Sequence, residues 1–173
     1  ERRRVPPQLP EPPPLQTVLI PAYNEGKVIA GAVRHILASD YPNLEVIVID
    51  DGSADDTSEQ VRIHFASDPR VRLFRVPNSG KAAALNIGLK EARGDVVVAL
   101  DADTDFEKDA ISKLVRWFQD PAVGAVAGNA KVCNRVNMIT RWQALEYVTS
   151  QNLERRALAA LGCITVVPGA IGA

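Results

Sequence analysis

The residues VVVALDADTD, Val96 to Asp105, place a β-branched apolar run directly before a cluster of acids. Such a run is typical of a buried strand. Three like charges immediately after a buried strand repel one another unless a positive group joins them, and a divalent cation with oxygen ligands is the simplest such group. The stretch therefore predicts a buried strand that ends in a cation-binding loop.

Three similar runs precede this one, and helical patterns separate all four. The runs are TVLIP (17–21), EVIVID (45–50) and VRLFRV (71–76). Helices are expected near 28–37, from a capping box at Ser53 and Asp56 to Phe65, near 80–93 and near 111–118. This alternation predicts a mostly parallel sheet between helices, with the ligand site at the carboxyl ends of the strands.

Length and charge narrow the function classes. With 173 residues, 46% of them hydrophobic, we expect one domain with a sizeable core. The formal net charge of −1 gives no general attraction to nucleic acid, so we expect no nucleic-acid partner and only local phosphate binding. Neither Cys133 nor Cys163 has the spacing of a zinc site. No apolar run reaches the roughly 20 residues of a membrane span, so this stretch is expected to be soluble.

The first 16 residues hold half of the 12 prolines and almost no periodic apolar pattern. This composition is typical of an extended linker. We therefore expect a proline-rich linker over 1–16 and a domain over 17–173.

Four polar loops are expected at the carboxyl edge of the predicted sheet. They contain PAYNE (21–25), DDGSADDT (50–57), NSGK (78–81) and DAD (101–103). At the third loop, Gly80 and Lys81 open a helix, where backbone N–H groups and a lysine favour an anion. Each loop alone is more often a polar turn or a solvated loop. Together, at one edge, they suggest a metal–phosphate ligand.

From Thr17 to the last residue the sequence resembles a known family, and the four loops carry its main motifs. The segments VLIPAYNE, VIVIDDGSADDT, NSGKAAALN and VVVALDADT resemble the nucleotide-binding half of family 2 inverting glycosyltransferases, which have the GT-A fold. The segments GNAKVCNRVNMITRWQALEYVTSQNLERRAL and ITVVPGAIGA are similar to bacterial poly-β-1,6-N-acetylglucosamine synthases. Chitin-oligosaccharide, hyaluronan and cellulose synthases share the motif order at greater distance.

The resemblance implies a fold and an activity. The fold would be α/β: a GT-A, Rossmann-like three-layer sandwich with a mostly parallel central sheet, truncated at its C-terminal side. The activity would be metal-dependent transfer of a sugar, N-acetylglucosamine by resemblance, from a UDP-sugar to a growing β-linked polysaccharide with inversion.

The resemblance also implies roles for individual residues. Tyr23 would stack on or flank uracil, while Glu25 and one of Asp50 or Asp51 would hold the uracil edge or the ribose. Asp103 would bind Mg²⁺ or Mn²⁺, Asp101 would support the ribose and the metal, and Lys81 would neutralise the UDP leaving group. The expected nucleotide-binding residues are Pro21, Ala22, Tyr23, Glu25, Asp50, Asp51, Lys81, Asp101 and Ala102, the metal residues Asp103 and Asp101, and the acceptor-side residues Gly169 and Ala170.

Two helical features outside these motifs are also predicted. Asp105 is expected to cap the helix that follows it. An amphipathic helix is expected from Ile139 to Leu161, and because Trp142, Leu145 and Val148 share helical spacing, core packing is the expected role of these three side chains.

Family members carry an acidic Glu-Asp motif with the general base, then a Gln-x-x-Arg-Trp motif, and this sequence stops before both. The resemblance thus implies a catalytic base beyond Ala173, a chain inactive alone, and a full-length protein embedded at the cytoplasmic face of a bacterial membrane. The open alternative is a UDP-sugar-binding module without turnover.

Two rival enzyme classes do not fit the motifs. A dehalogenase-type phosphatase would need threonine at Asp105, and a dinucleotide oxidoreductase would need Gly-x-Gly-x-x-Gly where PAYNEG stands.

Overall fold

The computed structural model describes residues 7–104, 107–128, 137–146, 149 and 171–173. In chain order its elements are β1 (Gln16–Ala22), α1 (Ile29–Leu37), β2 (Leu44–Asp51), α2 (Thr57–Phe65), β3 (Val71–Val76), α3 (Lys81–Glu91), β4 (Val96–Leu100), α4 (Ala110–Val115), the 3-10 helix η1 (Arg116–Gln119), α5 (Met138–Glu146) and β5 (Ile171–Gly172). The predicted alternation of strands and helices through α4 is therefore confirmed.

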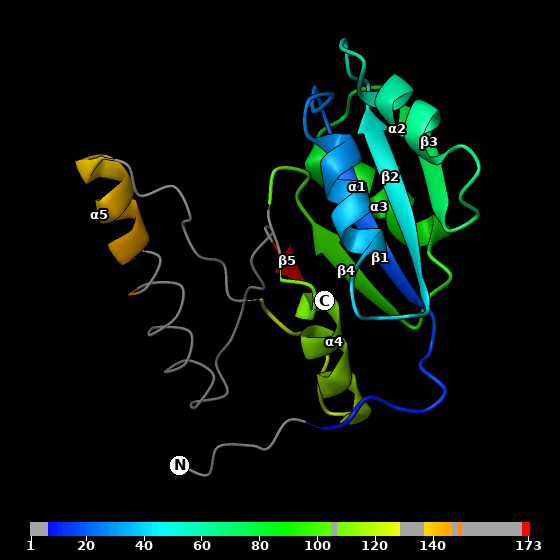
Figure 1. The fold of residues 1–173 in the computed structure, drawn as a ribbon, viewed down its shortest axis with the longest axis vertical. Coiled ribbons are helices and arrows are strands. Elements are labelled where there is room, and N and C mark those ends of the chain that lie inside the picture. The colour runs from blue at the N-terminus through cyan, green and yellow to red at the C-terminus, as the bar shows by residue number, and fades with distance from the viewer. Residues whose placement is uncertain (1–6, 105–106, 129–136, 147–148, 150–170) are drawn as a thin grey trace.

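The strands form one sheet in the order β3-β2-β1-β4-β5 (Figure 1). The first four are parallel, and only the two-residue β5 runs antiparallel, beside the end of β4. Chain order starts in the middle of the sheet, runs outward through β2 and β3, and then returns to the other side of β1. The strand order therefore reverses between β1 and β4, which makes this gap the topological switch point where open α/β sheets bind ligands.

Helices cover both faces of the sheet, which gives the predicted three layers. Helices α1, α2 and α4 pack on one face and contribute to the larger core cluster, and α3 packs on the other face over a smaller one. In Figure 1, α1 lies in front of the sheet and α3 behind it. The α1 stripe buries Ile29, Ala32, Val33 and Ile36, as its spacing predicts.

Strand β2 is buried on both faces of the sheet, as is usual for a strand of a parallel sheet. All eight of its residues are buried, because helices cover both of its faces. Val46 and Val48 belong to the larger cluster, whereas Ile47 and Ile49 belong to the smaller one. Each of these side chains contributes about 1.5–3 kcal/mol through burial. A continuous apolar run, rather than an alternating one, is the pattern that this environment requires.

The proline-rich segment lies against the domain at the amino-terminal end of β1. The buried Tyr41 hydroxyl donates to the Pro14 carbonyl at 2.7 Å, and Asn43 Nδ2 donates to the Pro13 carbonyl at 3.0 Å. Leu9 packs against the larger core cluster. Figure 1 shows this segment running beneath α4 before it turns into β1. Strand β1 itself begins at Gln16, one residue before the expected boundary.

One local expectation differs from the structure, and two others fall partly or wholly outside the described residues. Helix α2 begins at Thr57 without a side-chain cap, so the capping box at Ser53 is wrong; its hydroxyl instead accepts the N–H of Asn24. Helix α4 begins after Asp109, whereas Asp105 lies outside the described residues. The described part of the expected 139–161 helix is α5.

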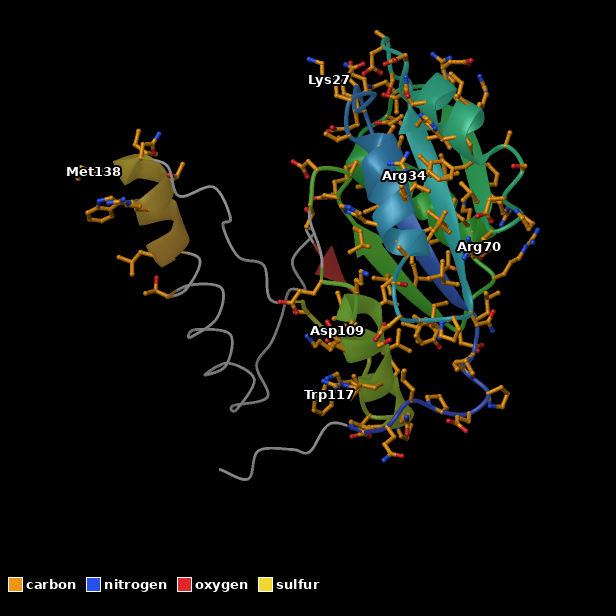
Figure 2. The ribbon with its side chains drawn as sticks, viewed as in Figure 1. Lys27, Arg34, Arg70, Asp109, Trp117 and Met138 are labelled. Atoms are coloured by element: carbon orange, nitrogen blue, oxygen red, sulfur yellow. The ribbon has the colours of Figure 1, made fainter. Side chains whose placement is uncertain are left out.

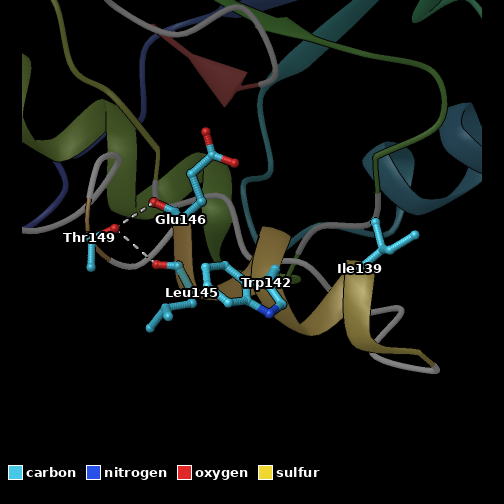
Figure 3. Close-up of a pocket in the computed structure, with 5 residues that line it drawn as sticks. All are labelled: Ile139, Trp142, Leu145, Glu146 and Thr149. Carbon is cyan, nitrogen blue, oxygen red and sulfur yellow. Dashed lines mark hydrogen bonds between the residues drawn. The ribbon is translucent and has the colours of Figure 1, made fainter.

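The apolar side of α5 is exposed, so core packing of Trp142 and Leu145 is wrong: they are 69% and 57% exposed. Val148 lies outside the described residues. Figure 3 shows the two side chains on an open concavity along the helix, where Thr149 Oγ1 donates to the carbonyls of Leu145 and Glu146. Figure 2 shows Met138 at the start of the same helix. Over the described residues, no helix combines the length and apolarity that a membrane crossing requires.

Candidate functional site

The candidate site lies at the carboxyl ends of β1 and β4. These strands are adjacent and parallel, with Leu19 opposite Ala99. The loop after β1 therefore runs beside the loop after β4, at the switch point of the sheet. Lys27, in the β1–α1 loop, is labelled at the top of Figure 2 and marks the position of this edge of the sheet.

Three acids from these two loops gather at the site. The pKa of Glu25 is raised from its ordinary value of 4.5, first by desolvation and then by the negative charges of Asp103, Asp55 and Asp101. Glu25 therefore lies within the electrostatic reach of both acids of the predicted DAD loop, as the motif order requires. Carboxylate oxygens are the donors that Mg²⁺ and Mn²⁺ prefer, so this donor set fits the expected cation.

The acids do not form a complete metal cage. Within the described residues, no three His, Cys, Asp or Glu side chains are grouped closely enough to hold a metal ion. A cation there would need oxygen ligands from a bound molecule, and the oxygens of a diphosphate would supply them.

Lys81 supplies positive charge at this cluster. It is the first residue of α3, and its Nζ lies 2.5 Å from Asp101 Oδ1. Both side chains are partly exposed, and an exposed ion pair of this kind contributes only about 0–1 kcal/mol. Replacing the Lys81–Asp101 ion pair by a Lys81–phosphate contact would therefore cost little free energy.

The start of α3 is already occupied by a protein carboxylate. Asp51 accepts the backbone N–H groups of Ser79 and Gly80, both at 2.8 Å. Of the backbone N–H groups expected to favour an external anion at Gly80 and Lys81, that of Gly80 thus binds Asp51 instead. The positive end of the α3 dipole also stabilises the negative charge of Asp51.

The Asp50 side chain lies on the face of the sheet opposite to that of Asp51. Its carboxylate accepts the Ser53 N–H at 2.8 Å and the Ser58 hydroxyl, and Arg75 Nε lies 3.8 Å away. Burial raises the pKa of Asp50, but the bonds from Ser53 and Ser58 and the charge of Arg75 outweigh it, so the pKa lies below its ordinary 3.8. Asp50 is thus a buried, ionised anchor of the β2–α2 loop.

The two acids diverge because successive strand residues point to opposite faces. Asp50 continues the face of Val48, toward α2, and Asp51 continues the face of Ile49, toward α3. Gly52 then brings the loops together: its φ is +73°, and a Cβ there would lie 2.7 Å from the Asn78 nitrogen. Only glycine fits this turn without strain.

The other residues predicted to bind the nucleotide differ in how far they are exposed to solvent. Tyr23 is 52% exposed at the edge, as a base-flanking side chain would have to be. Ala22 and Ala102 are buried beneath the two loops, and Pro21 is half-buried in β1. Gly169 and Ala170 lie outside the described residues, so the acceptor side stays a prediction.

Sequence reasoning missed a group of loop residues. Asn24, Ser53, Asp55 and Thr57 join the β1–α1 loop to the β2–α2 loop through four hydrogen bonds. The available signal was their residue type, because Ser, Thr, Asn and Asp bind nearby backbone in turns. Their partners, however, lie about 30 residues away along the chain.

Comparison with known sequences identifies relatives with a stated activity. The profile of glycosyl transferase family 2 matches residues 17–169. Poly-beta-1,6-N-acetyl-D-glucosamine synthase of Staphylococcus aureus is 34% identical over 88% of this chain and 37% of that protein. The synthase of the same name from Staphylococcus epidermidis is 33% identical over 87% of this chain and 37% of that protein. The chain thus spans little more than a third of these relatives.

Solved structures share the fold. Mannosyltransferase PcManGT from Pyrobaculum calidifontis, in complex with GDP-Man and Mn²⁺, has a TM-score of 0.63 and 37% identity, over 75% of this chain and 39% of that chain. S. aureus TarS 1-349 in complex with UDP-GlcNAc has a TM-score of 0.61 and 25% identity, over 69% and 37%. Both are GT-A glycosyltransferases. With the profile covering most of the sequence, these findings show that the chain belongs to glycosyl transferase family 2.

Proposed function

We propose that this chain binds UDP-N-acetylglucosamine together with Mg²⁺ or Mn²⁺ at the edge formed by β1 and β4. In the full-length protein, the sugar would pass with inversion to a growing β-linked polysaccharide. The observation that carries the proposal is the convergence of Glu25, Asp101, Asp103 and Lys81 at the switch point of the sheet. The names of the staphylococcal relatives and the UDP-GlcNAc complex of TarS support the choice of sugar nucleotide.

Tyr23, which is exposed, and Glu25, which is half-buried, would recognise the base. Tyr23 would flank uracil, and Glu25 would accept hydrogen bonds from the uracil edge or the ribose. Of the two neighbouring aspartates, Asp51 is the better candidate for a nucleotide contact, because it faces the loop before Lys81 whereas Asp50 faces Ser58 and Arg75. Ala22 and Ala102, which are small and buried, would let the nucleotide approach the backbone closely.

Asp103 would be the main protein ligand of the cation, with Asp101 as its neighbour. A divalent cation at this position would stabilise negative charge on the diphosphate. Lys81 would bind a phosphate oxygen after leaving Asp101, and so would stabilise the UDP leaving group as the sugar bond breaks.

The proposal extends to the wider protein. Residues 17–173 would be the donor-binding portion of the GT-A domain, with Gly169 and Ala170 toward the polysaccharide acceptor and residues 1–16 joining it to other parts. The full-length protein would lie at the cytoplasmic face of a bacterial membrane.

Turnover by the chain alone is not expected. Among the described residues of the site, the acids are assigned to nucleotide, cation or loop anchoring, and general-base catalysis typically contributes about 10²–10⁴-fold. The alternative function is a binding module without turnover. Incubation with UDP-N-acetylglucosamine, Mn²⁺ and a β-linked N-acetylglucosamine oligomer, followed by mass spectrometry, should show no elongation, and efficient elongation would overturn this assignment.

The nucleotide assignment is tested by thermal unfolding with UDP, ADP and GDP, each with and without Mn²⁺. A ligand at 100 times its dissociation constant adds about 2.7 kcal/mol of stability. UDP with Mn²⁺ should give the largest shift. GDP is the informative competitor, because PcManGT, at 37% identity, was solved with GDP-Man. A larger shift with GDP would replace UDP by a guanine nucleotide as the donor.

A further inference from the structure

Three consecutive backbone N–H groups of the β1–α1 loop bind side chains of the β2–α2 loop and of Thr57, the first residue of α2. The pairs are Asn24 to Ser53 Oγ (2.9 Å), Glu25 to Thr57 Oγ1 (2.9 Å) and Gly26 to Asp55 Oδ2 (3.0 Å). Successive N–H groups of this kind often form a concave anion site. Here protein oxygens fill it, so this turn does not serve as a phosphate site.

The side chains that accept these bonds are themselves held. The Thr57 hydroxyl donates to the Asp55 carboxylate, which also accepts the Thr57 N–H at 3.0 Å. Thr57 is fully buried. The Glu25 N–H is thereby linked through one hydroxyl to a carboxylate, and the Gly26 N–H binds the same carboxylate directly.

The first loop also binds back to the second. The Ala54 N–H donates to Asn24 Oδ1 at 2.9 Å, and Asn24 has φ +56°, a region that residues other than glycine rarely adopt. Gly26 lies so close to the second loop that a Cβ would come within 2.1 Å of Asp56 Oδ1. The two loops therefore form one rigid unit rather than two independent turns.

We propose that Ser53, Asp55 and Thr57 are positioning residues for the nucleotide site, which fix the backbone of residues 24–26 so that Glu25 stays beside the DAD loop. The inference rests on the proposed function, because it assigns these three residues a role in nucleotide binding. Its physical basis is preorganisation: a loop that is already ordered loses less conformational freedom when the ligand binds.

The test uses Thr57→Val, which removes the hydroxyl while keeping the shape of the side chain, and Thr57→Ser, which keeps the hydroxyl. Ser112→Ala is the matched control, since the Ser112 hydroxyl donates to Asp40 Oδ1 at 2.5 Å, outside the described site. Ser53→Ala tests the neighbouring bond if Thr57→Val does not fold. Amide hydrogen exchange should show faster exchange of the Glu25 N–H in Thr57→Val alone.

Calorimetric titration with UDP and Mn²⁺ then measures the positioning role well below the unfolding temperature. Thr57→Val should weaken UDP binding by about tenfold, while Thr57→Ser and Ser112→Ala should bind like the parent. In a Glu25→Gln background, Thr57→Val should weaken binding much less, because it acts through Glu25. A purely structural role would leave UDP affinity unchanged in the folded variant.

The outcomes separate the two proposals. If the parent binds UDP and folded Thr57→Val binds it equally well, the positioning role is wrong and the proposed function stands. Equal losses with and without Glu25→Gln would also overturn the positioning role. If the parent does not bind UDP with Mn²⁺, the proposed function fails and the positioning role fails with it.

Discussion

Replacing Asp51 by alanine should destabilise the domain more than any exposed carboxylate substitution does. Asp51 accepts two backbone N–H groups at the start of α3, and its side chain is nearly buried. In Asp51→Ala those N–H groups of Ser79 and Gly80 lose their acceptor, and the start of α3 loses its attachment to β2.

The structure sets the size of the effect. Hydrogen bonds to a charged group contribute about 1.5–3 kcal/mol each, which gives about 3–6 kcal/mol for two. Favourable interaction with the helix dipole adds about 0.3–1 kcal/mol. Because the variant no longer buries a carboxylate, part of this loss is recovered. We therefore expect the free energy of unfolding to fall by about 2–4 kcal/mol.

Urea unfolding monitored by far-ultraviolet circular dichroism measures this difference. Asp68→Ala is the matched control: Asp68 also accepts a backbone N–H, from Arg70 at 3.0 Å, but it lies in a surface turn. The control should lose at most about 1 kcal/mol. If Asp51→Ala loses no more stability than Asp68→Ala, the anchoring of α3 by Asp51 is wrong.

Three further substitutions test other parts of the account. Tyr41→Phe should lower the free energy of unfolding by about 1 kcal/mol in urea, because it removes the bond to Pro14; an unchanged value would contradict docking of the proline-rich segment. Glu25→Gln should stabilise the cation-free protein in thermal unfolding at about pH 7 but not below pH 4.5. The raised pKa of Glu25, caused first by desolvation and then by Asp103, makes the folded state lose stability as the pH rises above 4.5, and a pH-independent effect would refute this. Gly52→Ala should cost about 1–3 kcal/mol, while Gly31→Ala in α1, where a Cβ meets nothing within 4 Å, should be neutral or stabilising; equal effects would contradict the strained turn.

The sheet was predictable because its strands are buried on both faces. Continuous runs such as Val46 to Ile49 have no other stable environment in a domain of this size, and the helices between them require parallel pairing. The two-residue β5 could not be foreseen, since Ile171–Gly172 carries no strand pattern of its own. The exposed stripe of α5 shows the complementary limit: helical spacing identifies an apolar face but not what covers it.

The site was predictable as a set of loops but not as a set of contacts. Asp50 and Asp51 look equivalent in sequence, yet the strand sends one toward α2 and the other toward α3. Ser53 failed as a helix cap because its hydroxyl already accepts the Asn24 N–H from the neighbouring loop. Such pairings depend on how two loops meet in space, and short-range propensity carries no information about that.

Calorimetric titration of UDP into the parent and into Asp103→Ala, with and without Mn²⁺, tests whether this edge of the sheet is a cation-dependent nucleotide site. Circular dichroism establishes that the variant remains folded. We expect Mn²⁺ to strengthen UDP binding to the parent, and we expect Asp103→Ala to lose most of this Mn²⁺-dependent gain. Binding of UDP by Asp103→Ala as tightly as by the parent in the presence of Mn²⁺ would contradict the assignment of this edge as a cation-dependent nucleotide site.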